Sequence, residues 1–264
     1  MSQSHGIKDL TEFAVDTIQM AGEAALSYYG KGGDQVKFDM TLVTETELHV
    51  TRLFQQQLRK HFPEHQLFEN NPLVTDYTHD EKRYLWIFDA LDCVANFQGG
   101  IPIWGISLAL LENFWPILGA FYMPTTGDLF WARAGHKAFW QDKAIQVSQQ
   151  EHINDESLLL TFSRFHQHYR SNFPGKIRNL GCTGAHLSYV AMGRAEAAIV
   201  SNVTYKDLAA LRVVIESAGG KIFKLDGTEF FLNEYLDGQD IDKDLLIMSP
   251  GALNQVRSYI THTR

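Results

Sequence analysis

Residues 86–97 read Trp-Ile-Phe-Asp-Ala-Leu-Asp-Cys-Val-Ala-Asn-Phe, so that an apolar segment leads directly into two acidic residues. The run from Leu85 to Phe88 is rich in strand-forming residues and predicts a buried strand that ends at Asp89. Asp92 follows three residues later, and two neighbouring carboxylates repel each other unless a cation lies between them. The pair therefore predicts either a metal site or a turn at Asp89 followed by a helix cap at Asp92.

The composition is that of a globular protein, with 264 residues of which 45% are hydrophobic and 20% are charged. A net charge of −8 without a basic patch argues against nucleic acid as a partner. The start of the chain lacks the apolar core of a signal peptide, and no segment approaches the roughly 20 apolar residues of a membrane span. We therefore expect a cytoplasmic protein with no membrane partner. Cys93 and Cys182 lie far apart in sequence, and we expect both to be reduced thiols.

The first half of the chain predicts two helices and a largely antiparallel sheet. Apolar residues at helical spacing predict helices over 7–29 and 44–62, with a short extended segment at 66–69. Strands are expected at 85–88, 103–111, 115–122, 129–132 and 138–140. These elements define an N-terminal α+β lobe over residues 1–150.

The second half alternates strands with helices. Strands are expected at 158–161, 197–200, 221–224 and 244–248, with helices over 185–192, 207–218 and 252–261. The polar segment at 148–156 predicts the boundary, so residues 151–264 form a C-terminal α/β lobe. We expect the two lobes to make one compact unit.

Four segments, 37–47, 68–70, 89–102 and 206–220, carry motifs that in this order, and over nearly the full length of the chain, resemble those of one known family, the inositol monophosphatase family. The family's first signature, Asp-Pro-Ile/Leu-Asp-Gly-Thr/Ser-x-Asn-Phe, is similar to residues 89–97, and its Gly-x-Pro continuation is intact at 100–102. The second signature, an Asp before a small-residue helix that ends in Glu-Ala-Gly-Gly, is similar to residues 206–220. The Gly-Glu-Glu metal segment resembles 68–70, and a Lys followed by Leu-Val-Thr-x-Thr-Asp/Glu resembles Lys37 with 42–47.

This resemblance implies an αβαβα layered sandwich of mixed α+β and α/β class, usually a homodimer, that acts as a Mg²⁺-dependent and lithium-sensitive phosphatase. It implies two or three Mg²⁺ ions and four catalytic carboxylates, with the Leu91 carbonyl as a further metal ligand; the four are Glu69, Asp89, Asp92 and Asp207. A metal-bound water would attack phosphorus in line. Taken singly, Asp207 is typical of a helix cap and Glu69 of a surface acid.

The resemblance also implies residues around the metal ligands. Glu47 would hold a water or Lys37 behind them, although the residue types alone favour surface charges at both positions. The phosphate would dock on backbone N–H groups at the start of the helix that follows Asp92, at Cys93, Val94 and Ala95. Thr183 lies in a segment that loosely resembles the substrate-binding wall of the family.

Several positions depart from the family pattern. Cys93 and Val94 replace a Gly-Thr pair of the family, in which the threonine hydroxyl positions the attacking water. Valine has no hydroxyl, and the loss of that hydrogen bond would lower the rate on the order of 10²-fold. Val200 stands where inositol-specific members carry a Glu, which argues against myo-inositol phosphate as a well-recognised substrate. Phe68, Asn70 and Lys206 replace the usual Gly, Glu and Trp.

Two function classes follow from these observations. The first is a Mg²⁺-dependent phosphomonoesterase for a small sugar, inositol-like or nucleotide phosphate, because the carboxylate set is complete. The second is a weakened or inactive family member that binds metal, a phosphorylated ligand or a protein partner, because the phosphate loop is altered.

Overall fold

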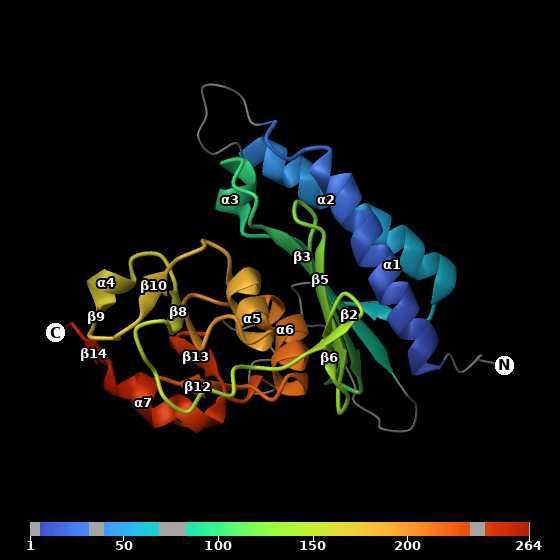
Figure 1. The fold of residues 1–264 in the computed structure, drawn as a ribbon. Coiled ribbons are helices and arrows are strands. Elements are labelled where there is room, and N and C mark those ends of the chain that lie inside the picture. Colours follow the sequence, from blue (N-terminus) through green and yellow to red (C-terminus); the bar gives the residue numbers. More distant parts are fainter. Residues whose placement is uncertain (1–5, 32–39, 69–82, 233–240, 264) are drawn as a thin grey trace.

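The computed structural model describes residues 6–31, 40–68, 83–232 and 241–263, including their side chains except at 40–44. Five layers of helices and sheets are stacked along the molecule (Figure 1). No helix of these residues combines the length and the apolar character needed to cross a lipid bilayer.

The outer layer on the N-terminal side consists of α1 (Ile7–Leu26) and α2 (Met40–His61), which cover one face of a seven-stranded sheet. The strands follow one another in chain order, and all neighbours are antiparallel except the first pair, which is parallel. They are β1 (Gln66–Leu67), β2 (Tyr84–Asp92), β3 (Gly105–Glu112), β4 (Trp115–Met123), β5 (Asp128–Arg133), β6 (Ala138–Trp140) and β7 (Lys143–Ile145). The short helix α3 (Val94–Gln98) follows β2.

The second sheet has five strands in the order β10-β8-β11-β13-β12. They are β8 (Leu158–Thr161), β10 (Lys176–Arg178), β11 (Ala197–Val200), β12 (Lys221–Lys224) and β13 (Leu245–Met248). Helices α5 (Thr183–Ala191) and α6 (Tyr205–Ser217) lie between the two sheets (Figure 1). The outermost elements are α4 (Phe165–His168), β9 (Tyr169–Ser171), a 3₁₀ turn (Pro250–Ala252), α7 (Leu253–Ser258) and β14 (Ile260–His262). The expected αβαβα sandwich is confirmed.

Helix α6 packs directly on the backbone of the large sheet. A Cβ atom at Gly119 of β4 would lie 2.0 Å from the Ala210 carbonyl oxygen, so only glycine permits this approach. Because both sides of α6 are covered, its buried residues surround the helix rather than forming one stripe. They are Tyr205, Leu208, Ala209, Ala210, Leu211, Val213, Val214 and Ile215.

The structure corrects several expected boundaries. Strand β2 does not end at Asp89 but runs on to Asp92, and α2 begins at Met40 rather than at 44. The single helix expected over 252–261 is a 3₁₀ turn, α7 and the strand β14, which pairs with β9. These elements are too short to show a hydrophobic period, and their pairing joins segments that are distant in sequence.

Candidate active site

A β-bulge brings the two carboxylates of the opening stretch to the same face of the sheet. Residues three apart on a regular strand point to opposite faces. Here Asp89 pairs with Ser107 and Asp92 pairs with Gly105, so three steps on β2 oppose two steps on β3. The extra residue on β2 places the side chains of Asp89 and Asp92 on the same face of the sheet. Both carboxylates therefore point toward the layer of α5 and α6.

The contacts of Asp92 show how closely α5 approaches the sheet. Its Oδ2 accepts a hydrogen bond of 3.0 Å from the Gly184 backbone N–H near the start of α5. A Cβ at Gly184 would lie 2.5 Å from that same oxygen, so glycine is required there. Burial raises the pKa of the Asp92 carboxyl well above its ordinary value, the negative charges of Asp89 and Asp207 raise it further, and the Gly184 hydrogen bond lowers it.

Asp207 joins this cluster from α6. It lies at the third position of the helix rather than before it, and it forms a capping box in which its Oδ2 accepts 2.7 Å from the Thr204 N–H. Burial raises the pKa of its carboxyl, as does Asp89, against the lowering effect of the Thr204 hydrogen bond. The cap that residue type alone predicts is therefore present, and the same side chain belongs to the carboxylate cluster.

Two further charges flank the cluster. Lys206 Nζ lies 2.9 Å from Asp89 Oδ1, with 35% of the lysine side chain exposed and 11% of the aspartate. Glu47 of α2 is half-buried, and the pKa of its carboxyl is raised by burial and by Asp89 and lowered by Lys206. Glu47 is thus near the cluster, whereas the residue type alone favours a surface charge. Lys206 was not among the expected site residues; its position one residue before Asp207 is the signal for it.

The chain turns sharply after Asp92. Cys93 has a left-handed backbone with φ of 71° and precedes α3. Within the described residues, the N–H groups of Val94 and Ala95 at the start of α3 have no backbone acceptor. Val94 is half-buried and Ala95 is exposed, while the Leu91 side chain is buried in the layer under α1 and α2.

The two cysteines form a disulfide, so the expectation of two reduced thiols is wrong for this structure. Their Cα atoms are 4.9 Å apart although 89 residues separate them in sequence. The fold brings the end of β2 against the start of α5, a contact that sequence separation does not reveal. Asn96 reinforces the junction, since its Nδ2 donates 2.8 Å to the Leu180 carbonyl oxygen.

A cavity of about 230 Å³ opens beside this junction. Thr183 and Val200, both singled out by the resemblance, line it. Within the described parts of the chain, His186 is the one titratable group of this lining apart from the disulfide-bonded Cys182. Burial lowers the pKa of the His186 imidazole to about 4. The full lining is Phe162, Ser163, Asn179, Gly181, Cys182, Thr183, His186, Val200, Ser201 and Asn202.

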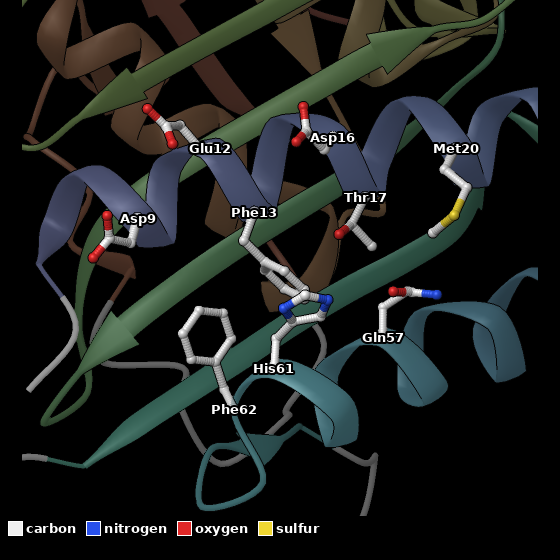
Figure 2. Close-up of a pocket in the computed structure, with 9 residues that line it drawn as sticks. All are labelled: Asp9, Glu12, Phe13, Asp16, Thr17, Met20, Gln57, His61 and Phe62. Atoms are coloured by element: carbon white, nitrogen blue, oxygen red, sulfur yellow. The ribbon is translucent and has the colours of Figure 1, made fainter. Parts of the chain in front are cut away.

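Two expected site residues, Lys37 and Glu69, lie outside the described residues. A separate cavity of about 440 Å³ lies between α1 and the C-terminal part of α2. Figure 2 shows acidic residues of α1, among them Asp9 and Asp16, and the rings of Phe13, His61 and Phe62 close together between the two helices. None of the residues that line this cavity is an expected site residue, so the cavity is distinct from the carboxylate cluster.

The comparisons with known proteins agree with this arrangement of layers. The model of the inositol monophosphatase family matches residues 7–252. A histidinol-phosphatase of Chlorobaculum parvum is 29% identical over 232 residues, which cover 84% of this chain and 88% of that protein. A fructose-1,6-bisphosphatase/inositol-1-monophosphatase of Thermotoga maritima is 25% identical over 227 residues, covering 84% and 87%.

The fold is also that of solved relatives. A dual specific IMPase/NADP phosphatase, solved with D-inositol-1-phosphate bound, superposes with a TM-score of 0.77 at 21% identity, covering 97% of this chain and 96% of that one. The chain belongs to the inositol monophosphatase family. The enzyme class expected from the resemblance, a phosphoric monoester hydrolase, is confirmed at the level of the family.

Proposed function

We propose that the protein is a Mg²⁺-dependent phosphomonoesterase for a small sugar, inositol-like or nucleotide phosphate. The observation that carries the proposal is the set of buried carboxylates that β2 and α6 direct into one place. The charge of Asp89 raises the pKa of Asp92, of Asp207 and of Glu47, and the charge of Asp207 raises that of Asp92 further. Among the described residues, Lys206 is the cation paired with Asp89. Such an excess of buried negative charge favours a bound cation.

The donor set fits magnesium. Carboxylate and carbonyl oxygens are the hard ligands that Mg²⁺ prefers. We propose that Asp89, Asp92 and Asp207 hold two or three ions, together with the Leu91 carbonyl and Glu69. Mg²⁺ held there would supply a water activated at neutral pH and would neutralise charge on the phosphoryl oxygens.

The chain's own groups bind and orient the ester. The open N–H groups of Val94 and Ala95 are donors for the phosphate oxygens, and Cys93 holds the left-handed turn that presents them. Lys206 offers a further positive charge at the edge of the cluster. We propose that Glu47, whose carboxyl pKa is raised by burial and by Asp89 and lowered by Lys206, holds a water or Lys37 behind the ligands.

The cavity beside Thr183 receives the alcohol part of the ester. Among the described residues, its lining has no carboxylate and no cationic side chain, and His186 is neutral at pH 7. A neutral polar wall suits a polyol or sugar better than a group with an ammonium. Within the range of esters named above, we therefore propose a sugar or polyol monophosphate whose alcohol part is uncharged, rather than histidinol phosphate. Val200, which accepts no hydroxyl, argues further against myo-inositol phosphate itself.

The altered loop supports a second candidate, a member that binds a phosphorylated ligand or a protein partner with little turnover. Val94 has no hydroxyl to position a water, and the Cys93–Cys182 disulfide braces the loop. We further propose a cytoplasmic homodimer in which lobes 1–150 and 151–264 act as one phosphatase unit. Light scattering at micromolar concentration tests the dimer, and a monomer mass contradicts it.

A panel of phosphate esters tests the function. Sugar, polyol, nucleotide, inositol and histidinol monophosphates are each assayed for phosphate release with and without Mg²⁺. We expect Mg²⁺-dependent release that is fastest with a sugar or polyol phosphate. A faster rate with histidinol phosphate overturns the substrate proposal, and silence across the panel with Mg²⁺ bound favours the second candidate.

A further inference from the structure

A second group of three potential metal ligands, which unlike the carboxylate cluster includes two sulfur atoms, lies at the end of β2. Asp92, Cys93 and Cys182 each offer one ligand atom, and these atoms all lie within 4.8 Å of one another. Cys182 Sγ is 3.8 Å from Asp92 Oδ2. The residues come from two segments that the fold holds together, the β2–α3 turn and the start of α5.

We propose that the reduced form of this protein binds Zn²⁺ through Cys93 Sγ, Cys182 Sγ and Asp92 Oδ2, and that the disulfide abolishes the site. Two thiolates and one carboxylate select Zn²⁺ over Mg²⁺, because Mg²⁺ prefers oxygen ligands throughout. With Zn–S near 2.3 Å and Zn–O near 2.0 Å, tetrahedral ligands are roughly 3.5 Å apart. The spacing of 3.8 Å between Cys182 Sγ and Asp92 Oδ2 already suits this geometry.

The surroundings of the site support metal entry and ligand orientation. The Gly184 N–H donates to Asp92 Oδ2 and fixes its direction, as outer groups do around zinc ligands. Cys93 is half-buried rather than enclosed, and Cys182 lines the cavity of about 230 Å³. A reductant and then a metal ion reach the sulfurs from that side, and a water completes the fourth position.

The disulfide is reduced in one step, and Zn²⁺ binds to the two thiols in a second step. A dithiol reductant supplies two electrons and two protons, the Sγ–Sγ bond breaks, and the reductant is left as a disulfide. Zn²⁺ then displaces the two thiol protons to solvent without any change in its own oxidation state. The sulfurs separate from bonding distance by rotation of their side chains.

The site shares Asp92 with the proposed magnesium cluster. Zinc bound there withdraws a carboxylate oxygen from that cluster, so zinc inhibits the reduced enzyme and leaves the oxidised enzyme unaffected. This consequence rests on the proposed function, whereas the binding itself does not.

Binding of Co²⁺, followed by its displacement with Zn²⁺, tests the proposal without an activity assay. The full chain is prepared oxidised, and also reduced with a phosphine that is then removed. We expect the reduced protein to bind one Co²⁺ with a thiolate-to-cobalt charge-transfer absorption that Zn²⁺ abolishes, and the oxidised protein to show none. The absence of this absorption in the reduced protein, or its presence in the oxidised protein, overturns the proposal.

Variants separate the ligands. Cys93→Ser and Cys182→Ser should each weaken Zn²⁺ binding on the order of 100-fold, and Asp92→Asn should weaken it while keeping the cobalt–thiolate absorption. Asp226→Asn, on an exposed turn, serves as the matched control for the loss of a carboxylate. Unchanged Zn²⁺ affinity in both cysteine variants contradicts the assignment, whether or not the protein hydrolyses any ester.

Discussion

Lys206 Nζ lies 2.9 Å from Asp89 Oδ1, so a lysine ammonium is paired with one of the carboxylates that we propose as metal ligands. The bulge in β2 and the close packing of α6 on the sheet together produce this pair. The ammonium neutralises part of the negative charge that a Mg²⁺ ion would neutralise.

Replacement of Lys206 by Gln should therefore tighten Mg²⁺ binding about tenfold, because a competing positive charge is removed. Calorimetric titration of Mg²⁺ measures the change. Lys221→Gln removes the same charge from the surface pair with Glu229 and should leave the affinity unchanged. Weaker binding in Lys206→Gln would mean that the lysine orders the site rather than competing with the ion.

Val94→Thr should raise kcat by 10- to 100-fold, roughly the contribution of one hydrogen bond that positions a nucleophile. The side chain is half-buried at the start of α3, and threonine has nearly the same shape as valine. Steady-state kinetics on the best ester measures the change, with Val94→Ala as the control for altered packing. If threonine and alanine give the same kcat, the missing hydroxyl is not what limits this enzyme.

His186→Gln should make the free energy of unfolding depend less on pH between pH 7 and pH 4. The buried imidazole accepts a hydrogen bond of 3.0 Å from the Leu180 N–H through Nε2, and burial lowers its pKa to about 4. As pH falls, the unfolded chain protonates His186 near pH 6.5, whereas the folded protein does so only near pH 4. The contribution of His186 to the free energy of unfolding is therefore complete above about pH 6.5 and is lost as pH falls toward 4, a change of about 3 kcal/mol.

Glutamine retains an acceptor for Leu180 but does not titrate. Denaturant unfolding of the wild type and His186→Gln between pH 4 and pH 7 measures the difference in free energy of unfolding. Parallel curves for the two proteins across this range would show that His186 is not responsible for the acid loss.

Asp92→Asn should stabilise the metal-free protein at neutral pH by on the order of 1 kcal/mol, a typical size for a substitution at a buried site. The folded state holds a proton on Asp92 to higher pH than the unfolded chain does, because its pKa is raised. The wild type therefore loses stability as pH rises from the ordinary carboxyl range toward the raised pKa, and the variant lacks this loss. Saturating Mg²⁺ should reverse the order of stability. Thermal unfolding of both proteins, once with chelator and once with saturating Mg²⁺, measures the order of stability with and without the metal.

The strands and long helices follow from the sequence because their hydrophobic periods are strong and local. Strands over 158–161, 197–200 and 221–224 have the expected bounds, as they are buried apolar runs between polar turns. The five-layer order followed from the resemblance rather than from periodicity.

The site depends on features that no local pattern contains. The bulge between Asp89 and Asp92 is a property of the pairing with β3, and without it a three-residue spacing on a strand predicts opposite faces. The disulfide and the ion pair of Lys206 both depend on how α5 and α6 fit against the sheet. The resemblance identified the carboxylates, whereas tertiary packing determines what surrounds them.

Phosphate release by the wild type and by Asp92→Asn, each with and without Mg²⁺, tests the central claim most directly. The assay uses the best ester of the panel, with the surface variant Asp226→Asn as the matched control. We predict that turnover requires both Mg²⁺ and Asp92 and that Asp226→Asn behaves as the wild type. Mg²⁺-dependent turnover retained by Asp92→Asn would contradict the assignment of this carboxylate cluster as the active site.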